Sequence, residues 1–111
     1  MIELTIKKHL DTVLDVKAFL EKPSASTGKY VVFEKTGSGK RNHLPSATFA
    51  FQSYAKSLYE AMELNARVKE AVEGLIELDD IRSVRLNSDY NFTDTTTKEY
   101  RYQAVFDINY Y

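Results

Sequence analysis

Cysteine is absent from this chain of 111 residues. Its absence excludes disulfides, cysteine-based zinc sites and thiol catalysis, and it suits a reducing cytosol. Long apolar runs are missing as well, because no stretch approaches the roughly 18 apolar residues that a membrane-spanning helix needs. The opening segment Met1–Lys8 has no long apolar core, so we do not expect a signal peptide. We therefore expect a protein without a membrane partner.

Excess charge of either sign is also missing. The formal net charge is −1, with 28% charged and 43% hydrophobic residues, which is ordinary for a globular protein. A domain that binds duplex DNA usually has a basic face, and this balance gives no general attraction to nucleic acid or to an anionic membrane. The length fits one domain, residues 1–111, which can bury one core without disulfide bonds.

A phosphate-binding loop is suggested by Gly37–Lys40, which reads Gly-Ser-Gly-Lys. The motif requires a glycine where the chain has Glu34, and serine or threonine where it has Arg41. These two departures favour a flexible turn over a nucleotide site.

Metal ligands are similarly sparse. His9 and His43 are the only histidines, and neither has a second nitrogen ligand at a spacing typical of zinc sites. The acidic residues Asp79–Asp80, Asp89 and Asp94 lack the central glycine and terminal glutamate of an EF-hand loop. We predict solvated histidines, a helix exit at Asp79–Asp80, no metal or cofactor, and no enzymatic activity.

The strongest pattern in the chain is a long amphipathic segment from Ser57 to about Leu78. Ser57 and Glu60 have the spacing of a capping box, in which each residue satisfies a free backbone N–H of the other. Glu63 and Arg67 stand four residues apart in the order that favours an ion pair on a helix. Apolar residues recur at helical spacing: Leu58, Ala61, Met62, Leu64, Val68, Ala71, Val72, Leu75 and Ile76. The pattern predicts one long helix that covers a sheet.

The first residues of the chain fit two patterns. Ile2, Leu4 and Ile6 alternate as in a strand, whereas Ile2, Ile6, Leu10 and Val13 recur as in a helix. The helical pattern accounts for more residues, so we predict a helix from about residue 2 to residue 12.

Five segments alternate apolar and polar residues, or are rich in β-branched and aromatic residues, which predicts strands. They are Val13–Glu21, Tyr30–Glu34, Ala47–Tyr54, Ser83–Tyr90 and Glu99–Tyr111. Pro23 ends the first strand, which we expect to pair with the second as an antiparallel hairpin. Polar loops are expected at Ser24–Gly28, at Thr36–Pro45 and at Asn91–Thr97, and the second of these is predicted to be mobile and mildly basic.

The predicted fold is α+β. It has an antiparallel sheet of about five strands packed against one long helix, in the order α-β-β-β-α-β-β. The regular alternation of the last strand is typical of a sheet with one face on the core.

Tyrosine is the residue that stands out, because four of the eight tyrosines fall in the last twelve residues. Such a strand could stack bases of single-stranded nucleic acid. However, Glu99, Asp107 and Asn109 are interleaved with these tyrosines as well as Arg101. Tyrosine also suits a half-buried strand or a protein interface, so we expect no direct nucleic-acid readout.

Several features, taken in order, resemble one known family over nearly the whole chain. They are a short N-terminal helix, a strand ending at Pro23, the segment Lys29–Lys35 with a glycine-containing loop after it, Phe49–Tyr54, the helix start Ser57–Ala61 and the terminal segment Arg101–Ile108. In this order they resemble the tail-terminator, or tail-completion, proteins of long-tailed bacteriophages.

This resemblance implies a structural virion protein that forms a ring, commonly a hexamer. The ring caps the finished tail tube, stops its polymerisation and offers a surface to the head connector. The expected partners are therefore further copies of the chain, the tail-tube protein and the head-connector protein. The expected location is the tail or neck of the virion, and the host cytoplasm during assembly. Alternatives are a head-side neck (head-completion) protein, a monomeric α+β domain that binds a small ligand or nucleic acid, and a small enzyme.

Ring formation requires head-to-tail contacts between different patches of one subunit. We expect the Thr36–Leu44 loop and the Asn91–Lys98 tip to become ordered on assembly. The terminal strand is a further expected contact. The residues predicted to make subunit or partner contacts are Lys40, Arg41, His43, Phe92, Tyr110 and Tyr111.

Overall fold

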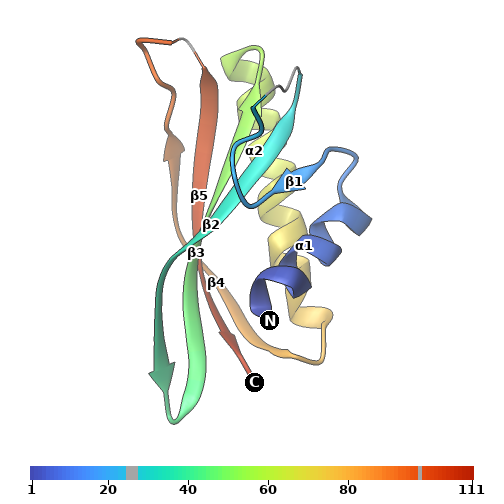
Figure 1. Ribbon diagram of the computed structural model, residues 1–111, viewed down its shortest axis with the longest axis vertical. Helices are drawn as coiled ribbons and strands as arrows, with labels where there is room; N and C mark the ends of the chain where they lie inside the picture. Colours follow the sequence, from blue (N-terminus) through green and yellow to red (C-terminus); the bar gives the residue numbers. More distant parts are fainter. Residues whose placement is uncertain (25–27, 98) are drawn as a thin grey trace.

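The computed structural model describes residues 1–24, 28–97 and 99–111, and it leaves the side chain of Arg41 undescribed. In this part of the chain, two α-helices lie on one face of a five-stranded sheet (Figure 1). The elements in chain order are α1 (Ile2–Val13), β1 (Ala18–Phe19), β2 (Tyr30–Arg41), β3 (Leu44–Ala55), α2 (Leu58–Glu73), the 3₁₀ helix η1 (Gly74–Glu77), β4 (Ile81–Asn91) and β5 (Tyr100–Tyr110). The chain is therefore α+β. The predictions for residues 25–27 and 98 lie outside the described residues.

Helix α1 follows the helical pattern rather than the strand pattern. Its buried residues Ile2, Ile6 and Leu10 lie four apart and face the core. Leu4, which only the strand pattern would bury, is exposed.

The prediction of a strand over Val13–Glu21 is wrong in extent and in pairing. Helix α1 takes Val13, and only Ala18 and Phe19 form a strand. This β1 pairs with β2 in parallel, with Ala18 opposite Val31. Alternation of apolar and polar residues gives no information on strand direction, which depends on the path of the connection. The sheet is therefore mixed, not antiparallel throughout.

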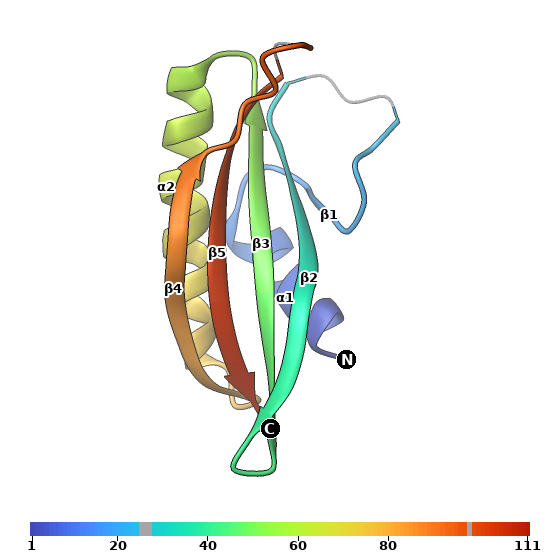
Figure 2. The same cartoon turned by 90° about the vertical axis from the view of Figure 1, so that its left-hand side faces the viewer.

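The prediction of a mobile loop over Thr36–Pro45 is also wrong. Strand β2 runs through it to Arg41 and β3 begins at Leu44, so Asn42 and His43 form a two-residue turn. Both turn residues have positive φ, 53° and 68°, as in the type I′ turn that matches the twist of a hairpin. We call the end of this hairpin, Gly37–Ser46, the arm. Figure 2 shows the arm extending past the end of the sheet where β5 finishes.

Helix α2 begins where the capping box predicts. The hydroxyl of Ser57 accepts a hydrogen bond of 3.2 Å from the backbone N–H of Glu60. The helix is shorter than predicted, because the α-helical turns end at Glu73 and continue as η1. The ion pair expected between Glu63 and Arg67 does not form, since Arg67 lies 2.8 Å from Asp15 instead.

The sheet has the strand order β1-β2-β3-β5-β4. The core lies between its helix side and the two helices, and four phenylalanines from three strands fill its centre: Phe33, Phe49, Phe51 and Phe106. Helix α2 and η1 bury five residues of the predicted apolar stripe: Ala61, Leu64, Val68, Val72 and Leu75. Three other members of that stripe, Leu58, Met62 and Ile76, are exposed because they lie toward the edge of the sheet.

Candidate interaction surfaces

The face of the sheet away from the helices, here called the open face, is polar and internally hydrogen-bonded. The amide of Gln52 donates to that of Gln103 over 2.8 Å, and Gln103 donates to the hydroxyl of Tyr90 over 2.6 Å. Further along, Thr48 donates to Asp107 over 2.8 Å. Since these groups satisfy one another, the middle of the open face offers few free donors or acceptors to a ligand.

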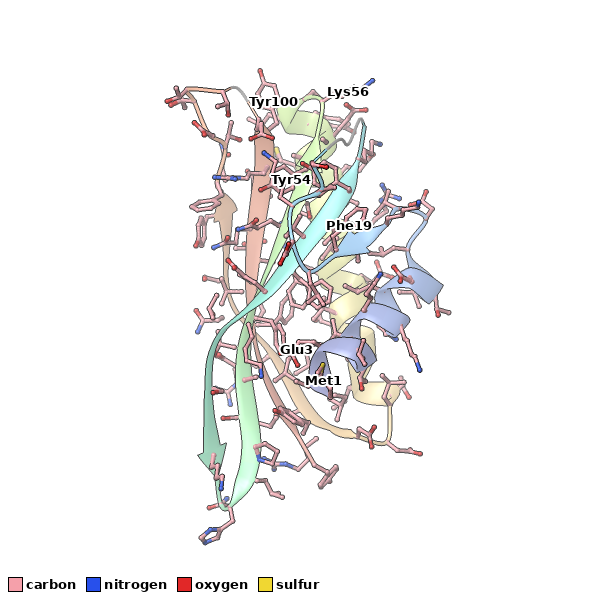
Figure 3. The ribbon with its side chains drawn as sticks, viewed as in Figure 1. Met1, Glu3, Phe19, Tyr54, Lys56 and Tyr100 are labelled. Carbon is pink, nitrogen blue, oxygen red and sulfur yellow. The ribbon has the colours of Figure 1, made fainter. Side chains whose placement is uncertain are left out.

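A cluster of aromatic side chains occupies the end of the open face opposite the arm. The rings of Tyr30 and Tyr54 stack with centroids 4.7 Å apart, and Phe19 meets Tyr30 edge-on at 6.2 Å. Figure 3 labels Phe19 on β1 and Tyr54 on β3, the strands on either side of β2. Offset and edge-on aromatic pairs of this kind add about 0.5–1.5 kcal/mol beyond their buried area.

Arg101 is the residue at this end that sequence reasoning missed. Its guanidinium lies 4.5 Å from the ring centroid of Phe92 and 5.6 Å from that of Tyr54. It also donates to the hydroxyl of Tyr54 over 2.9 Å and to the carbonyl of Phe92 over 2.6 Å. An arginine in a strand between tyrosines was the only signal, and it could not identify the stacking partners.

The basic contact residues predicted in the loop lie together at the tip of the arm. Lys40 and the backbone of Arg41 end β2, and His43 is in the turn. The side chains of Lys40 and His43 are exposed. Sequence reasoning therefore grouped these residues correctly but expected a mobile loop, whereas the structure has them on a regular hairpin.

The two terminal tyrosines lie at the same end of the sheet as the arm. Asn109 of β5 pairs with Ser46 at the base of the arm, and Tyr110 follows opposite Ile81. Tyr111 is 68% exposed, and its ring centroid is 5.9 Å from the guanidinium of Arg82.

Phe92, the sixth predicted contact residue, lies elsewhere. It follows β4 at the opposite end of the sheet, where it packs against Arg101. Five of the six predicted residues are therefore at one end of the molecule, and Phe92 is at the other.

His9 is not the solvated side chain that the sequence suggested. Its Nε2 lies 2.8 Å from the carbonyl oxygen of Ala71, and an added Cβ at Gly74 would approach the same nitrogen to 3.4 Å. The imidazole therefore links α1 to the end of α2. Within the described residues, no three His, Cys, Asp or Glu side chains gather as a metal site would require. Neither helix described has the length and apolar character needed to cross a membrane.

Two carboxyl groups have shifted pKa values. Partial burial acts to raise the pKa of Glu3, but a hydrogen bond to its own backbone N–H and the ammonium of Lys35 outweigh burial, so the net shift is downward. The pKa of Asp94 is lowered by the backbone N–H groups of Thr96 and Thr97, which donate to its carboxylate in the β4–β5 connection. Neither shift produces a group poised to exchange protons near neutral pH.

No protein-family model and no curated protein matches the chain. The family resemblance therefore rests on the order of motifs along the chain.

Proposed function

We propose that this protein is a tail terminator of a long-tailed bacteriophage, a structural protein that forms a ring on the end of the tail tube. The arm is the observation that carries the proposal. It brings Lys40 and His43 to one tip, at the same end of the sheet as the exposed Tyr111, which follows β5. In a ring, identical subunits point the same way, so the arm ends would form one continuous face that can seat on the tube.

The geometry of the arm supports a binding role. Its two-residue turn and the paired ends of β2 and β3 are already formed in the free chain. A preformed element loses less conformational entropy on docking than a mobile loop, so more of its contact energy appears as affinity. The basic residues at the tip would favour an acidic partner surface, through an attraction that salt weakens.

The proposal can be tested by adding the purified protein to polymerising tail-tube subunits and measuring tube length by electron microscopy. We expect shorter tubes of defined length with a ring at one end. Lys40→Glu with Arg41→Glu should weaken this capping without unfolding the protein. The matched control is Lys17→Glu with Lys56→Glu, which makes the same change in charge at exposed positions away from the arm.

Three outcomes are informative. Capping by the control variant but not by the arm variant supports the proposal. Equal capping by both variants means that the arm tip is not the tube contact. If the unmodified protein neither decorates nor shortens tubes, the tail-terminator assignment fails and a head-side neck role takes its place.

A further inference from the structure

One edge of the sheet is open along its whole length. Strand β4, eleven residues long, pairs with β5 on one side, and no described strand pairs with its other side. Such an edge presents a row of free backbone N–H and C=O groups to a possible partner strand. Exposed large hydrophobic residues flank it: Leu58, Met62, Ile76, Leu86, Tyr90 and Phe92.

The position of these side chains follows from the contacts between α2 and β4. Asn65 and Lys69 of α2 both bind the carboxylate of Asp89 on β4. Met62 lies three residues before Asn65, and Ile76 lies seven residues after Lys69. Both therefore occupy the same side of the helical segment, toward β4. Leu86 lies opposite the buried Phe106 and thus on the helix side of the strand.

The opposite edge of the sheet is open over half its length. Strand β1 covers β2 only at Val31 and Val32, which leaves the outer side of Glu34–Lys40 without a described strand. Helix α1 reaches β2 on the helix side of the sheet, where Glu3 pairs with Lys35 over 3.2 Å. Figure 2 shows α1 and β1 on the β2 side of the sheet and β4 at the other side. Two exposed hydrophobic residues belong to or follow these elements: Leu4 is on α1, and Leu20 follows β1.

We infer that the outer edge of β4 in one copy pairs with the outer edge of β2 in a second copy. This inference specifies the subunit contact of the ring and so rests on the proposed function. The two edges differ and lie on opposite sides of one molecule, so the contact is head-to-tail, the type that generates rings. The same contact would remove from water apolar residues that flank β4.

Strand direction agrees with this pairing. β2, β3, β5 and β4 alternate in direction, so β4 and β2 of one molecule run opposite ways. Rotation about a ring axis lying near the strand direction preserves those directions. The junction would then be antiparallel, the more stable type of pairing, and would continue the alternation from one copy to the next.

Charge is complementary across the same junction. Arg85 of β4 and Glu34 of β2 both lie on the open face and are exposed. Neither has an ion-pair partner among the described residues. When paired residues are followed across β3 and β5, Glu34 falls in the same cross-strand row as Ser88. Arg85 lies in the adjacent row of the open face. A β4–β2 contact would bring the guanidinium and the carboxylate together.

Bulges explain why such edges need not polymerise freely. The register of β4 shifts between Ile81 and Ser83 and again between Leu86 and Ser88, and that of β2 shifts between Lys35 and Gly37. Each shift interrupts regular pairing and limits the contact to short stretches. A weak contact of this kind would form best when several copies are held together on the end of a tube.

The natural lack of cysteine makes a direct test possible. The variant Glu34→Cys with Ser88→Cys places one thiol on each edge, in one row of the open face. A short bismaleimide, which tolerates a small offset in register, would be applied to concentrated protein and to protein on tube ends. We expect a ladder of linked oligomers that ends at one closed ring. The matched control, Glu34→Cys with Glu70→Cys, puts the second thiol on the exposed face of α2 and should give no ladder above background.

Exchanging the charges at Arg85 and Glu34 provides a second test. Arg85→Glu and Glu34→Arg should each weaken self-association several-fold alone, because each sets like charges against each other. An equal mixture of the two variants should recover it, since every junction pairs opposite charges when the two variants alternate around the ring. Linked dimers from Ser88→Cys alone would instead indicate a β4–β4 contact and overturn the inference, as would a ladder no stronger than the control. Tube capping without the ladder refutes only this contact, whereas the ladder without capping refutes only the tail-terminator assignment.

Discussion

The carboxylate of Glu3 on α1 lies 3.2 Å from the ammonium of Lys35 on β2, immediately before the bulge that begins the arm. The contact joins α1 to Lys35, the last residue of β2 before the register of its pairing with β3 shifts. Glu3 and Lys35 are only partly exposed, with 24% and 32% of their side-chain surface accessible, so solvent screens the pair incompletely.

This pair predicts a specific dependence of stability on pH. The pKa of Glu3 is lower in the folded chain than its ordinary value of 4.5, so its contribution is fully present above 4.5 and is lost as pH falls through the folded pKa. Glu3→Gln should therefore be less stable than the unmodified protein near neutral pH. Urea melts from about pH 7 to about pH 3 should show the difference shrinking toward zero. A difference that stays constant over this range would contradict the assignment.

The phase of α2 gives a second prediction. Val72 is fully buried and Glu70 is exposed two residues away. Val72→Asp would bury an unpaired carboxylate and should cost several kcal/mol of unfolding free energy, or prevent folding. Glu70→Ala should change it by no more than about 0.5 kcal/mol. Urea melts that found the two variants equally stable would show that the helix faces the sheet with a different side.

The sequence predicted those parts of the fold in which local and global preferences agree. Buried Val68 and Val72 follow helical periodicity, and the hydroxyl of Ser57 caps α2 as its spacing to Glu60 indicates. The alternation that predicts the last strand likewise buries Ala104. Each of these features depends on neighbours a few residues away.

Features that depend on distant residues could not be predicted in this way. The Asp15 that binds Arg67 is 52 residues away, and nothing in the local spacing distinguishes it from Glu63. The arm was missed because Gly37 and Gly39 indicate a loop, whereas the strand is maintained by pairing with β3. The six predicted contact residues were chosen by type, so their separation into two ends of the sheet became visible only in three dimensions.

Arg101 supports a prediction about the end of the sheet opposite the arm. Its guanidinium stacks on Phe92 and bonds to two oxygen atoms, contacts that an ammonium cannot reproduce together. Arg101→Lys should lower the unfolding free energy by about 1–2 kcal/mol. Arg85→Lys is the control, because Arg85 is exposed on the same face. This variant should change the unfolding free energy by less than about 0.5 kcal/mol. Similar losses in the two variants, measured by urea melts, would refute a stabilising role for the stack.

Substitutions of His43 in the turn of the arm can distinguish the role of its side chain from that of the backbone conformation. His43 has φ of 68°, a conformation that costs little for glycine and is unfavourable for β-branched residues. His43→Gly should raise the unfolding free energy by about 0.5–1 kcal/mol, and His43→Val should lower it by at least about 1 kcal/mol.

Tube capping by these two variants then tests what the arm contributes. If the imidazole itself contacts the tube, His43→Gly should cap poorly although its arm is more stable. If the tube recognises the hairpin shape and its neighbouring cations, His43→Gly should cap at least as well as the unmodified protein, and His43→Val should cap less well. We expect the second result, because a preformed hairpin pays less entropy on docking and one exposed, unpaired imidazole adds little affinity. Capping lost equally in both variants would assign the contact to the His43 side chain.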